Sequence, residues 1–526
     1  MDQVVDRAVE REHALMKMLR TRTPFVETYL QNLKFVPQVG PAPVQDHYFL
    51  GRMDLGEGMD RRDYLSKNTR FENRQLGGFT KLFMFEYKPM GFSWMIYADR
   101  NDFDRHTYDF KYARREFLGD VRCFVFEVSA KKGTGNGRFR GRIWVEDQDY
   151  NIVRLNGFYE PRPRNDYFFH LDSWRLNLIP GYWVPAYIYS EEGDFGNGSK
   201  DEMTFKAQTR LWGYDLKKGT ESEFTQVRVD STVKDESPAA QDASPLQAQW
   251  QWQQQAGDNV IERLQKAGLL APEGEVDQVL ETVVNNLLTT NNIELPGPVR
   301  TRVMLTSPLE TFSAGNTIVV SRGLVDVLPD EASLAMVLSR ELAHIVLGHN
   351  LGSKYAFNDR VLFSDESIYQ NLGFRHVPEE EDAADKKALD LLKNSPYAQK
   401  LDTAGLFLRE LAARGPALSA LLSPHLGTGF TDRKGAVDRM VVLMNSAPAL
   451  DPDKLDQIAA LPLGGRVKLN AWDDHAELIK TAPVAITSAR GKMPLEVTPF
   501  FPRLTRYGAI VNPTAPVIAA NPSPSN

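Results

Sequence analysis

The alternation of hydrophobic and polar residues divides the chain into two parts with different periods. Between about residues 48 and 216, aromatic and β-branched residues recur at every second position in short runs, such as LFMFEY at 82–87 and CFVFEVSA at 123–130. Short strands between turn residues are typical of an antiparallel sheet or an open barrel. From residue 276 the apolar residues are spaced three and four apart, as in an amphipathic helix. They are Val276, Val279, Leu280, Val283, Val284, Leu287 and Leu288.

Weaker patterns predict the remaining elements. Residues 1–35 carry apolar residues at roughly helical spacing and predict one or two amphipathic helices. Further along, 299–306 and 317–321 predict short strands, and 330–350 predicts a long helix with acidic residues in its first turn, as the helix dipole prefers. The segment 233–257 is rich in Ser, Pro, Ala and Gln and has no period, so we expect a linker there.

Composition narrows the classes of protein that the chain can represent. Hydrophobic residues make up 42% and charged residues 25%, the balance of an ordinary globular protein. The formal net charge of −7 shows no basic excess, which argues against a nucleic-acid partner. No run of about 18 apolar residues predicts a transmembrane helix. The single cysteine, Cys123, excludes an internal disulfide and a cysteine-based zinc site, and we interpret it as a small core residue.

The first residues do not resemble a secretory leader. MDQVVDRAVEREHALMKMLR alternates charged and apolar residues, whereas a leader has a basic start and an uninterrupted apolar core. Two localisations therefore stay open. The protein is periplasmic or otherwise exported if a leader has been omitted from this sequence, and cytoplasmic if none precedes it.

One hairpin in the first part has a more specific pattern. In GRIWVEDQDYNIVRL at 141–155, a hydrophobic strand meets an acidic turn and then a second hydrophobic strand. This resembles the hairpin of lipoprotein-carrier-like (LolA-type) half-barrels, over about residues 60–215. The resemblance implies a curved sheet whose apolar concavity, lined by aromatics such as Phe83 or Phe139, holds a lipid, an acyl chain or a peptide. An ordinary interaction sheet is the alternative.

The predicted helix at 330–350 carries the candidate chemistry. Arg340, Glu341 and His344 fall within about 100° of arc, because residues four apart nearly eclipse on a helix. Zinc peptidases use this geometry as H-E-x-x-H, in which two imidazoles one turn apart hold zinc and the glutamate takes a proton from the bound water. Here the string is Arg340-Glu341-Leu342-Ala343-His344, so arginine stands where the first histidine would be.

The surroundings of this helix extend the pattern. LETFSAGNTIVVSRGLVDVL at 309–328 precedes it and EDAADKKALDLL at 381–392 follows it. Over about residues 275–445 these blocks resemble the gluzincin metallopeptidases of the HtpX-like and CAAX-prenyl-protease type. The resemblance implies a mainly helical metallopeptidase-like domain, zinc as cofactor and a protein or peptide substrate. The family's transmembrane helices are missing, so the likeness is to its soluble members.

The resemblance also implies roles for individual residues. Glu341 stands at the general-base position, and His344 and Glu381 stand at zinc-ligand positions. Asp385 stands at the position of a carboxylate that does not bind the metal but orients a ligating histidine. The family also has a histidine and an arginine that stabilise the oxyanion. His425 and Arg433 are the candidates for these two, although their order and spacing differ from the family pattern.

Arg340 removes one zinc ligand from this set. A guanidinium has no lone pair to give, which leaves two protein ligands where catalytic zinc normally has three. His349 is five residues past His344, about 140° around a continued helix, so we expect it to point elsewhere. His376 lies in a predicted loop from which it can swing towards Glu381. We otherwise interpret His349, His376 and His475 as surface or hydrogen-bonded histidines.

We predict that Arg340 forms a salt bridge with Glu381, Glu341 or both, and so stands in electrostatically for the metal. Three functions follow as alternatives. The first is a metallopeptidase fold without activity that serves as a binding or quality-control module for a protein client. The second is an active zinc-dependent endopeptidase. The third is a carrier of lipid or peptide through the β domain.

The expected fold class is α+β and multidomain. An antiparallel, half-barrel-like β domain is followed by a mainly helical metallopeptidase-like domain. The predicted boundaries are 1–40 for an N-terminal helical segment, 41–216 for the β domain, 217–257 for the linker, 258–510 for the metallopeptidase-like domain and 511–526 for a disordered tail.

Overall fold

The structure is a computed structural model of the whole chain. It describes residues 1–36, 40–56, 61–63, 94–99, 102–135, 137–160, 169–192, 204–214, 245–349, 373–451, 453–454, 456–464, 467–469, 476–478 and 495–507. Among the described helices, none is long and apolar enough to cross a membrane.

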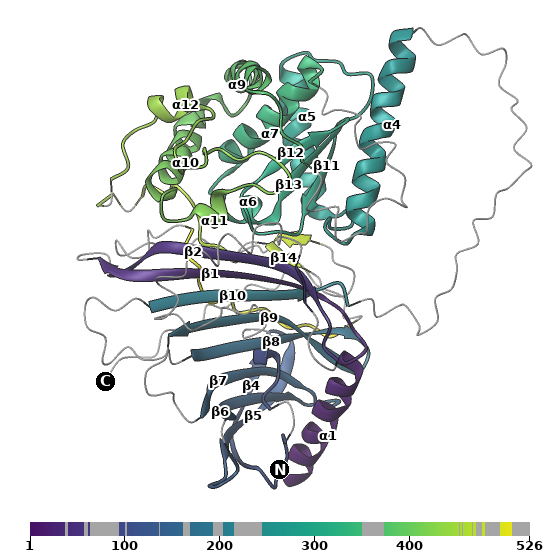
Figure 1. The fold of residues 1–526 in the computed structure, drawn as a ribbon, viewed down its shortest axis with the longest axis vertical. Helices are drawn as coiled ribbons and strands as arrows, with labels where there is room; N and C mark the ends of the chain where they lie inside the picture. The colour runs from purple at the N-terminus through teal and green to yellow at the C-terminus, as the bar shows by residue number, and fades with distance from the viewer. Residues whose placement is uncertain are drawn as a thin grey trace, which may run out of the picture.

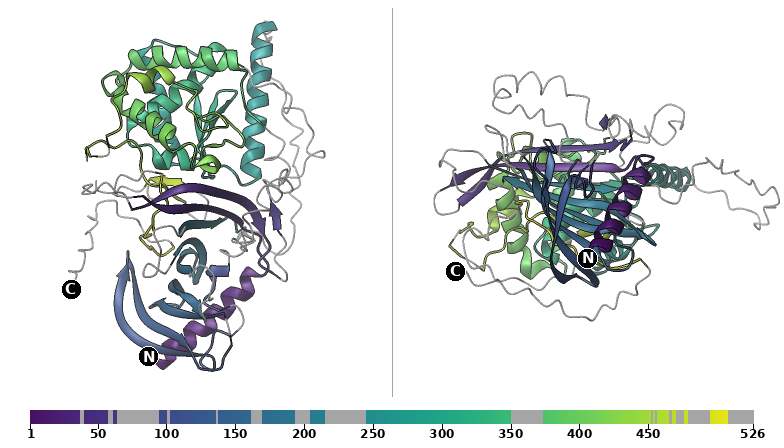
Figure 2. Two further views of the ribbon diagram at one scale, coloured as in Figure 1. Left: turned by 60° about the vertical axis from the view of Figure 1, so that its left-hand side comes forward. Right: turned by 90° about the horizontal axis from the view of Figure 1, so that it is seen from below.

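Over the described part of the N-terminal half, the chain forms one curved antiparallel sheet (Figures 1 and 2). The strand order is β3-β2-β1-β10-β9-β8-β7-β6-β5-β4, so β1 pairs with β10 from the far end of the half. This confirms the predicted antiparallel β domain. The strands are β1 Phe25–Val36, β2 Gly40–Met53, β3 Arg61–Asp63, β4 Tyr108–Leu118, β5 Val121–Ala130, β6 Arg138–Glu146, β7 Ile152–Glu160, β8 Phe169–Ile179, β9 Tyr182–Glu192 and β10 Thr204–Trp212.

The first 36 residues form one helix and one strand. Helix α1, Asp2–Leu19, agrees with the predicted amphipathic helix. The prediction of one or two helices over residues 1–35 is wrong for residues 25–35. They form most of strand β1, in the interior of the sheet. From Phe25 to Leu33 every side chain is buried, so both faces of the strand are covered and the apolar spacing no longer distinguishes strand from helix.

Helix α1 lies on the inner side of the curved sheet (Figure 2). Its apolar residues pack with one face of the strands, where Phe139 is fully buried. A buried ion pair reinforces this packing, because Arg175 of β8 donates to Glu12 of α1 at 2.5 and 2.7 Å. Among the described residues, α1 and residues 95–98 pack on the face of the sheet that carries Phe139. Phe83, the other predicted lining residue, lies outside the described residues.

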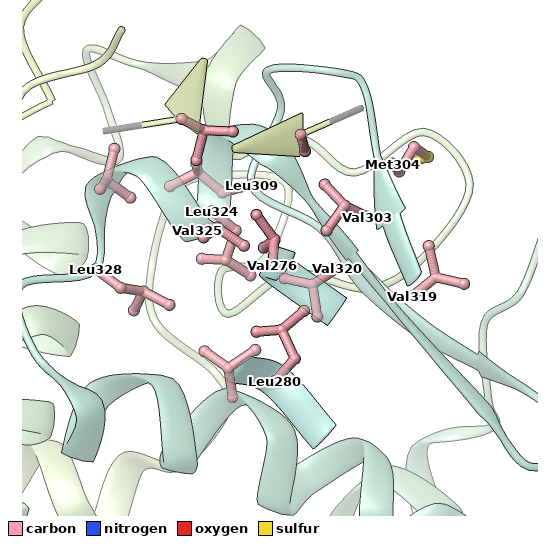
Figure 3. Close-up of a cluster of buried hydrophobic side chains, with 14 of the residues drawn as sticks. Val276, Leu280, Val303, Met304, Leu309, Val319, Val320, Leu324, Val325 and Leu328 are labelled. Atoms are coloured by element: carbon pink, nitrogen blue, oxygen red, sulfur yellow. The ribbon is translucent and has the colours of Figure 1, made fainter. Parts of the chain in front are cut away.

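The C-terminal half packs helices around a three-stranded sheet of order β11-β13-β12. Figure 3 shows Val276 and Leu280 of α5 gathered with Val303 of β11 and Val320 of β13 in the hydrophobic core. This arrangement confirms the α+β organisation and the predicted strands and helices, and it adds β12. The elements are α4 Pro245–Lys266, α5 Glu275–Thr290, β11 Arg300–Met304, β12 Thr311–Ala314, β13 Thr317–Ser321, α6 Arg322–Val327, α7 Glu331–Leu347, α9 Pro378–Lys393, α10 Leu401–Arg414, α11 Ser419–Leu422, α12 Val441–Ser446, β14 Val467–Leu469 and β15 Ala476–Leu478, with short 3₁₀ turns at Trp94–Ile96 (η3) and Ala398–Lys400 (η5).

The end of the expected linker is helical. Helix α4 begins at Pro245, so residues 245–257 belong to a helix, and residues 217–244 lie outside the described residues. Gly257 allows α4 to approach the turn between β12 and β13, because a Cβ at this position would lie 2.6 Å from the backbone nitrogen of Gly315. The glycine in the low-complexity run is thus a packing residue.

One hydrophobic core runs through both halves of the molecule. It joins the outer face of the sheet, including Trp174 and Tyr187, to the helices of the C-terminal half. The end of the described chain, residues 495–507, also lies on this face, where Phe501 packs edge-on against Trp174 and Phe500 against Tyr187. The two predicted domains are therefore in close contact, and residues 495–507 pack on the sheet.

Candidate functional site

Helix α7 positions the three central side chains. Its N-cap Asp330 accepts a hydrogen bond from the Ser333 N–H at 2.8 Å, and the helix ends at Gly348 in the left-handed conformation. Arg340, Glu341 and His344 are all buried, with relative exposures of 0, 1 and 0%. Three ionisable side chains are therefore withdrawn from water in a single turn, which is costly unless each has a partner.

The predicted ion pair between Arg340 and Glu381 is present. Helix α9 runs beside α7 and provides two carboxylates, Glu381 and Asp385, one turn apart. The Arg340 guanidinium donates to Glu381 Oε2, and its Nε lies 3.3 Å from Asp385 Oδ1. Its Nη1 lies 3.8 Å from Glu341 Oε1 and donates to Thr428 Oγ1 at 3.2 Å. One buried cation is thus surrounded by three carboxylates.

The pKa shifts of the side chains agree with an ion pair between Arg340 and the surrounding carboxylates. Burial alone would raise the pKa of Glu381, but His344, whose Nε2 lies 3.5 Å from Glu381 Oε2, and the charge of Arg340 lower it from 4.5 to about 2. Burial would lower the pKa of Arg340, but Glu381, Glu341 and Asp385 together raise it. Burial raises the pKa of Glu341 and that of Asp385 against the effect of Arg340. The Glu381 carboxylate is therefore kept ionised by Arg340 and His344 together.

Three histidines meet beside this ion pair. The ring of His344 stacks on that of His376 at 3.8 Å between centroids, and its Nδ1 lies 3.0 Å from His349 Nδ1. The expectation that His349 points elsewhere is wrong. Helical rotation stops at Gly348, whose positive φ of 70° turns the next residue back towards α7. His376 lies in the predicted loop before α9 and does reach the site.

Two of the three clustered histidines, His349 and His376, have lowered pKa values and are uncharged at neutral pH. Burial and the neighbouring His344 lower the pKa of His376 to about 4, although Nδ1 of His376 is 2.9 Å from Glu380 Oε2. Burial also lowers the pKa of His349. Arg340 therefore places among the carboxylates a positive charge that does not depend on the protonation of His349 or His376.

A second arginine, Arg439, also contacts Glu381. Arg439 Nε lies 3.7 Å from Glu381 Oε2, and the N–H of the next residue, Met440, donates to Asp385 at 2.8 Å. Arg433, the candidate from the sequence, is exposed. No local pattern distinguishes the two arginines, because the contact joins a loop to a helix that is distant in the chain.

His425 lies against the N-terminal half. Its ring stacks on Tyr48 of β2 at 5.5 Å between centroids, and its backbone N–H donates to Glu310 at 2.8 Å. Burial lowers its pKa to about 4. The structure therefore gives His425 a contact at the junction of the two halves, and an oxyanion role for it is only an expectation from the resemblance.

The segment after His425 covers the edge of the small sheet. β12 is an edge strand, and Thr311 exchanges backbone hydrogen bonds with Thr428 at 2.9 and 3.0 Å. The Glu310 carboxylate accepts the N–H groups of residues 425–427, which holds the turn in place. An open strand edge is a general way to bind an extended peptide, and here part of this edge is already paired.

The donor set of the site does not fit zinc. Arg340 lies among the carboxylates and has no lone pair to offer a metal. Among the described residues, no group of three or more His, Cys, Asp or Glu side chains is arranged to hold a metal ion. The stacked rings of His344 and His376 are parallel within 11°, whereas metal ligands must converge on one point.

In the C-terminal half, the buried helix with the E-x-x-H string lies beside a second helix that carries a glutamate, and both pack with a small mixed sheet. This is the architecture of a metallopeptidase-like domain. Residues 273–365 match the family model of peptidase family M48. This match confirms the predicted likeness to that class of metallopeptidases over residues 273–365. It covers the helix with Arg340, Glu341 and His344, but it ends before Glu381 and Asp385.

Two solved structures are similar to the chain. One is described as an outer membrane lipoprotein-sorting protein domain from Vibrio parahaemolyticus, with 11% identity, 41% of this chain and 95% of that chain covered, and a TM-score of 0.21. The other is a DUF1329 family protein from Desulfovibrio piger, with 13% identity, 41% and 94% covered, and a TM-score of 0.20. No curated protein matches the chain.

Proposed function

We propose that the C-terminal half is a metallopeptidase fold that has lost hydrolysis and serves as a binding or quality-control module for a protein or peptide client. One observation carries the proposal. Arg340, which stands at the first zinc-ligand position of the resemblance, is fully buried and paired with Glu381, the third ligand position. A permanent cation therefore occupies the charge-balancing role that a metal has in active relatives.

The loss of hydrolysis follows from the chemistry of the side chains. In a zinc peptidase the glutamate of the motif takes a proton from a water that the metal has made acidic. Arginine cannot act as a Lewis acid towards water, and its fork of N–H donors is already directed at carboxylates. Glu341, with its raised pKa, then has no activated nucleophile to serve.

The other candidate functions have less support in the described residues. The apolar face of the sheet packs against α1, so no observation favours a carrier of acyl chains. An active zinc endopeptidase requires a ligand set that Arg340 interrupts.

Replacing Arg340 with histidine tests the proposal. We expect purified wild-type protein to contain almost no zinc and to leave casein intact. Arg340→His should take up about one zinc ion per chain, because the introduced imidazole would join His344 and Glu381 and restore three ligands. Metal analysis by mass spectrometry and cleavage of labelled casein, with and without a chelator, are the measurements.

Arg340→Gln is the matched control, because it removes the charge without adding a ligand, and it should not gain zinc. Chelator-sensitive cleavage of casein by the wild-type protein would contradict the proposal and establish the active endopeptidase instead. Zinc uptake by Arg340→Gln equal to that of Arg340→His would show that position 340 does not decide metal binding.

A further inference from the structure

A second buried arginine, Arg210, lies at the junction of the two halves, and no described carboxylate forms an ion pair with it. Arg210 of β10 is only 7% exposed, yet it makes no hydrogen bond or ion pair with any residue in the described part of the chain. Its nearest aromatic contact is distant, with the guanidinium carbon 5.9 Å from the centre of the Tyr187 ring. A buried guanidinium whose N–H donors are unsatisfied is costly, so this arrangement points to a ligand that accepts hydrogen bonds there.

Arg322, at the start of α6, brings a second cation to the same place. It is fully buried, and its Nη2 donates to Glu27 at 2.9 Å and to Ser307, whereas its Nη1 has no hydrogen-bond partner among the described residues. Burial and the charge of Arg322 lower the pKa of Arg210 to about 10, although the charges of Asp326 and Glu27 act to raise it. The nearest described carboxylate to Arg322 Nη1 is Asp326, at 3.9 Å.

Gln208 adds a neutral donor to the two cations. It precedes Arg210 by two residues on β10 and is 2% exposed, and in the described part of the chain neither its amide nitrogen nor its amide oxygen has a partner. Gly464 lies over both side chains, because a Cβ there would lie 2.7 Å from Gln208 Oε1 and 3.7 Å from Arg210 Nη2. The N–H of Gly464 donates to Asp326, which connects this side of the cluster to Arg322.

The two carboxylates near the cluster are already engaged. Glu27 accepts hydrogen bonds from the Ser307 N–H, the Tyr48 hydroxyl and Arg322. Asp326 accepts the N–H groups of Gly464 and Val467. Neither carboxylate is within ion-pair distance of Arg210. Within the described structure, unsatisfied donors therefore remain on Arg210, Arg322 and Gln208, and all three are buried.

We propose that a small oxyanion, a phosphate or a carboxylate group, binds between Arg210, Arg322 and Gln208 where the sheet meets the C-terminal half. Guanidinium groups bind oxyanions through planar pairs of N–H donors, and a primary amide adds a directed donor. Because β10 and α6 belong to different halves, the bound anion ties the halves together. A buried water would satisfy the hydrogen bonds without neutralising the charge, and the experiment below distinguishes these cases.

Equilibrium dialysis of the full chain against radiolabelled inorganic phosphate tests the site. We expect about one phosphate per chain, and an affinity at least about tenfold lower in Arg210→Gln, because a charge-assisted pair is replaced by a neutral one. At constant ionic strength, phosphate should raise the melting temperature of the wild type, because a ligand that binds only the folded state stabilises it. It should not raise that of Arg210→Gln.

Two further variants complete the test. Arg503→Gln is the matched control, because it removes the same charge from an exposed pair with Asp120, and it should bind phosphate like the wild type. Gln208→Leu keeps both arginines and should weaken binding by about two- to tenfold, the value of one hydrogen bond. It also serves if Arg210→Gln fails to fold. Acetate that displaces the labelled phosphate would extend the site to carboxylates.

Three outcomes would overturn the proposal. The first is that neither phosphate nor acetate stabilises the wild type at constant ionic strength. The second is phosphate binding that is unchanged in both Arg210→Gln and Gln208→Leu. The third is binding that falls equally in Arg503→Gln, because that would reflect net charge alone.

Discussion

Arg340→Ala is expected to lower the free energy of unfolding by about 3–5 kcal/mol at neutral pH, the range for removing one partner of a buried ion pair. The substitution leaves Glu341, Glu381 and Asp385 close together without the central guanidinium, whose side chain is fully buried. The effect is large because three carboxylates share one cation. Urea unfolding followed by far-UV circular dichroism measures it.

The pH dependence distinguishes this electrostatic loss from a packing defect. In the wild type the pKa of Glu381 is lowered from 4.5 to about 2, so its contribution to stability is present above about pH 4.5 and disappears as the pH falls towards 2. In Arg340→Ala that lowering is lost, and the carboxylates can take up protons near pH 4–5. The difference in stability between wild type and variant should therefore shrink from pH 7 to about pH 4.

Arg439→Ala is the matched control for this experiment. Arg439 also contacts Glu381, at 3.7 Å, but its side chain is 20% exposed, so its removal should cost only about 0–1 kcal/mol. A loss in Arg340→Ala that stays the same at both pH values would show that packing, not charge, explains it. Equal losses in the two variants would show that Arg340 has no special place in the network.

The central ion pair of the site was predictable from the sequence because both partners lie on regular helices. On α7, Arg340 and His344 are one turn apart, and the block around Glu381 forms a second helix as predicted. The chemistry then follows, since an arginine at a ligand position requires a carboxylate partner. Helical periodicity places Arg340 and His344 on one face, and the resemblance to the metallopeptidase blocks is what placed Glu381 beside them.

The histidine cluster was missed for a different reason. A helical wheel continued through His349 points this side chain away from His344. Gly348, just before it, is a typical signal for the end of a helix, so the wheel does not apply to His349. The stacking of His376 on His344 and the contact of Arg439 with Glu381 depend on how loops pack, and no spacing in the sequence carries that information.

Strand β1 is an element of the fold that the local sequence pattern also could not predict. Its residues are apolar or buried on both faces, so neither a period of two nor a period of 3.6 is expressed clearly. What makes it a strand is pairing with β2 on one side and with β10 on the other, and β10 lies nearly the whole length of the half away in the chain. Such pairing is a tertiary property.

Strand β1 also carries the carboxylate on which the second prediction rests. Glu27 pairs with Arg322 of α6 at 2.9 Å, and the two side chains are 2% and 0% exposed. Arg322→Met should lower the free energy of unfolding by about 3–5 kcal/mol, because the Glu27 carboxylate would stay buried without its cation. Since the pair joins the two halves, the substitution should mainly weaken the contact between them. We expect the wild type to unfold in one transition and the variant in two.

Two probes separate the halves in a urea titration. Trp144, Trp174, Trp183 and Trp212 lie on strands of the sheet, so fluorescence reports on the N-terminal half in a background where Trp250, Trp252 and Trp472 are replaced by Phe. Far-UV circular dichroism is dominated by the helices of the C-terminal half. The two curves should coincide for the wild type and separate for Arg322→Met. The exposed pair of Arg503 with Asp120 also joins residues of the two predicted domains, and its removal in Arg503→Gln should leave the curves together.

Glu27→Gln combined with Arg322→Met should recover most of the lost stability. The neutral amide oxygen introduced by Glu27→Gln can still accept from the Ser307 N–H and the Tyr48 hydroxyl, and position 27 no longer buries a charge without Arg322. A double variant no more stable than Arg322→Met would show that the loss came from the shape of Arg322 and not from its charge. Curves that coincide in every variant would mean that the hydrophobic core shared by the two halves is sufficient to unfold them as one unit.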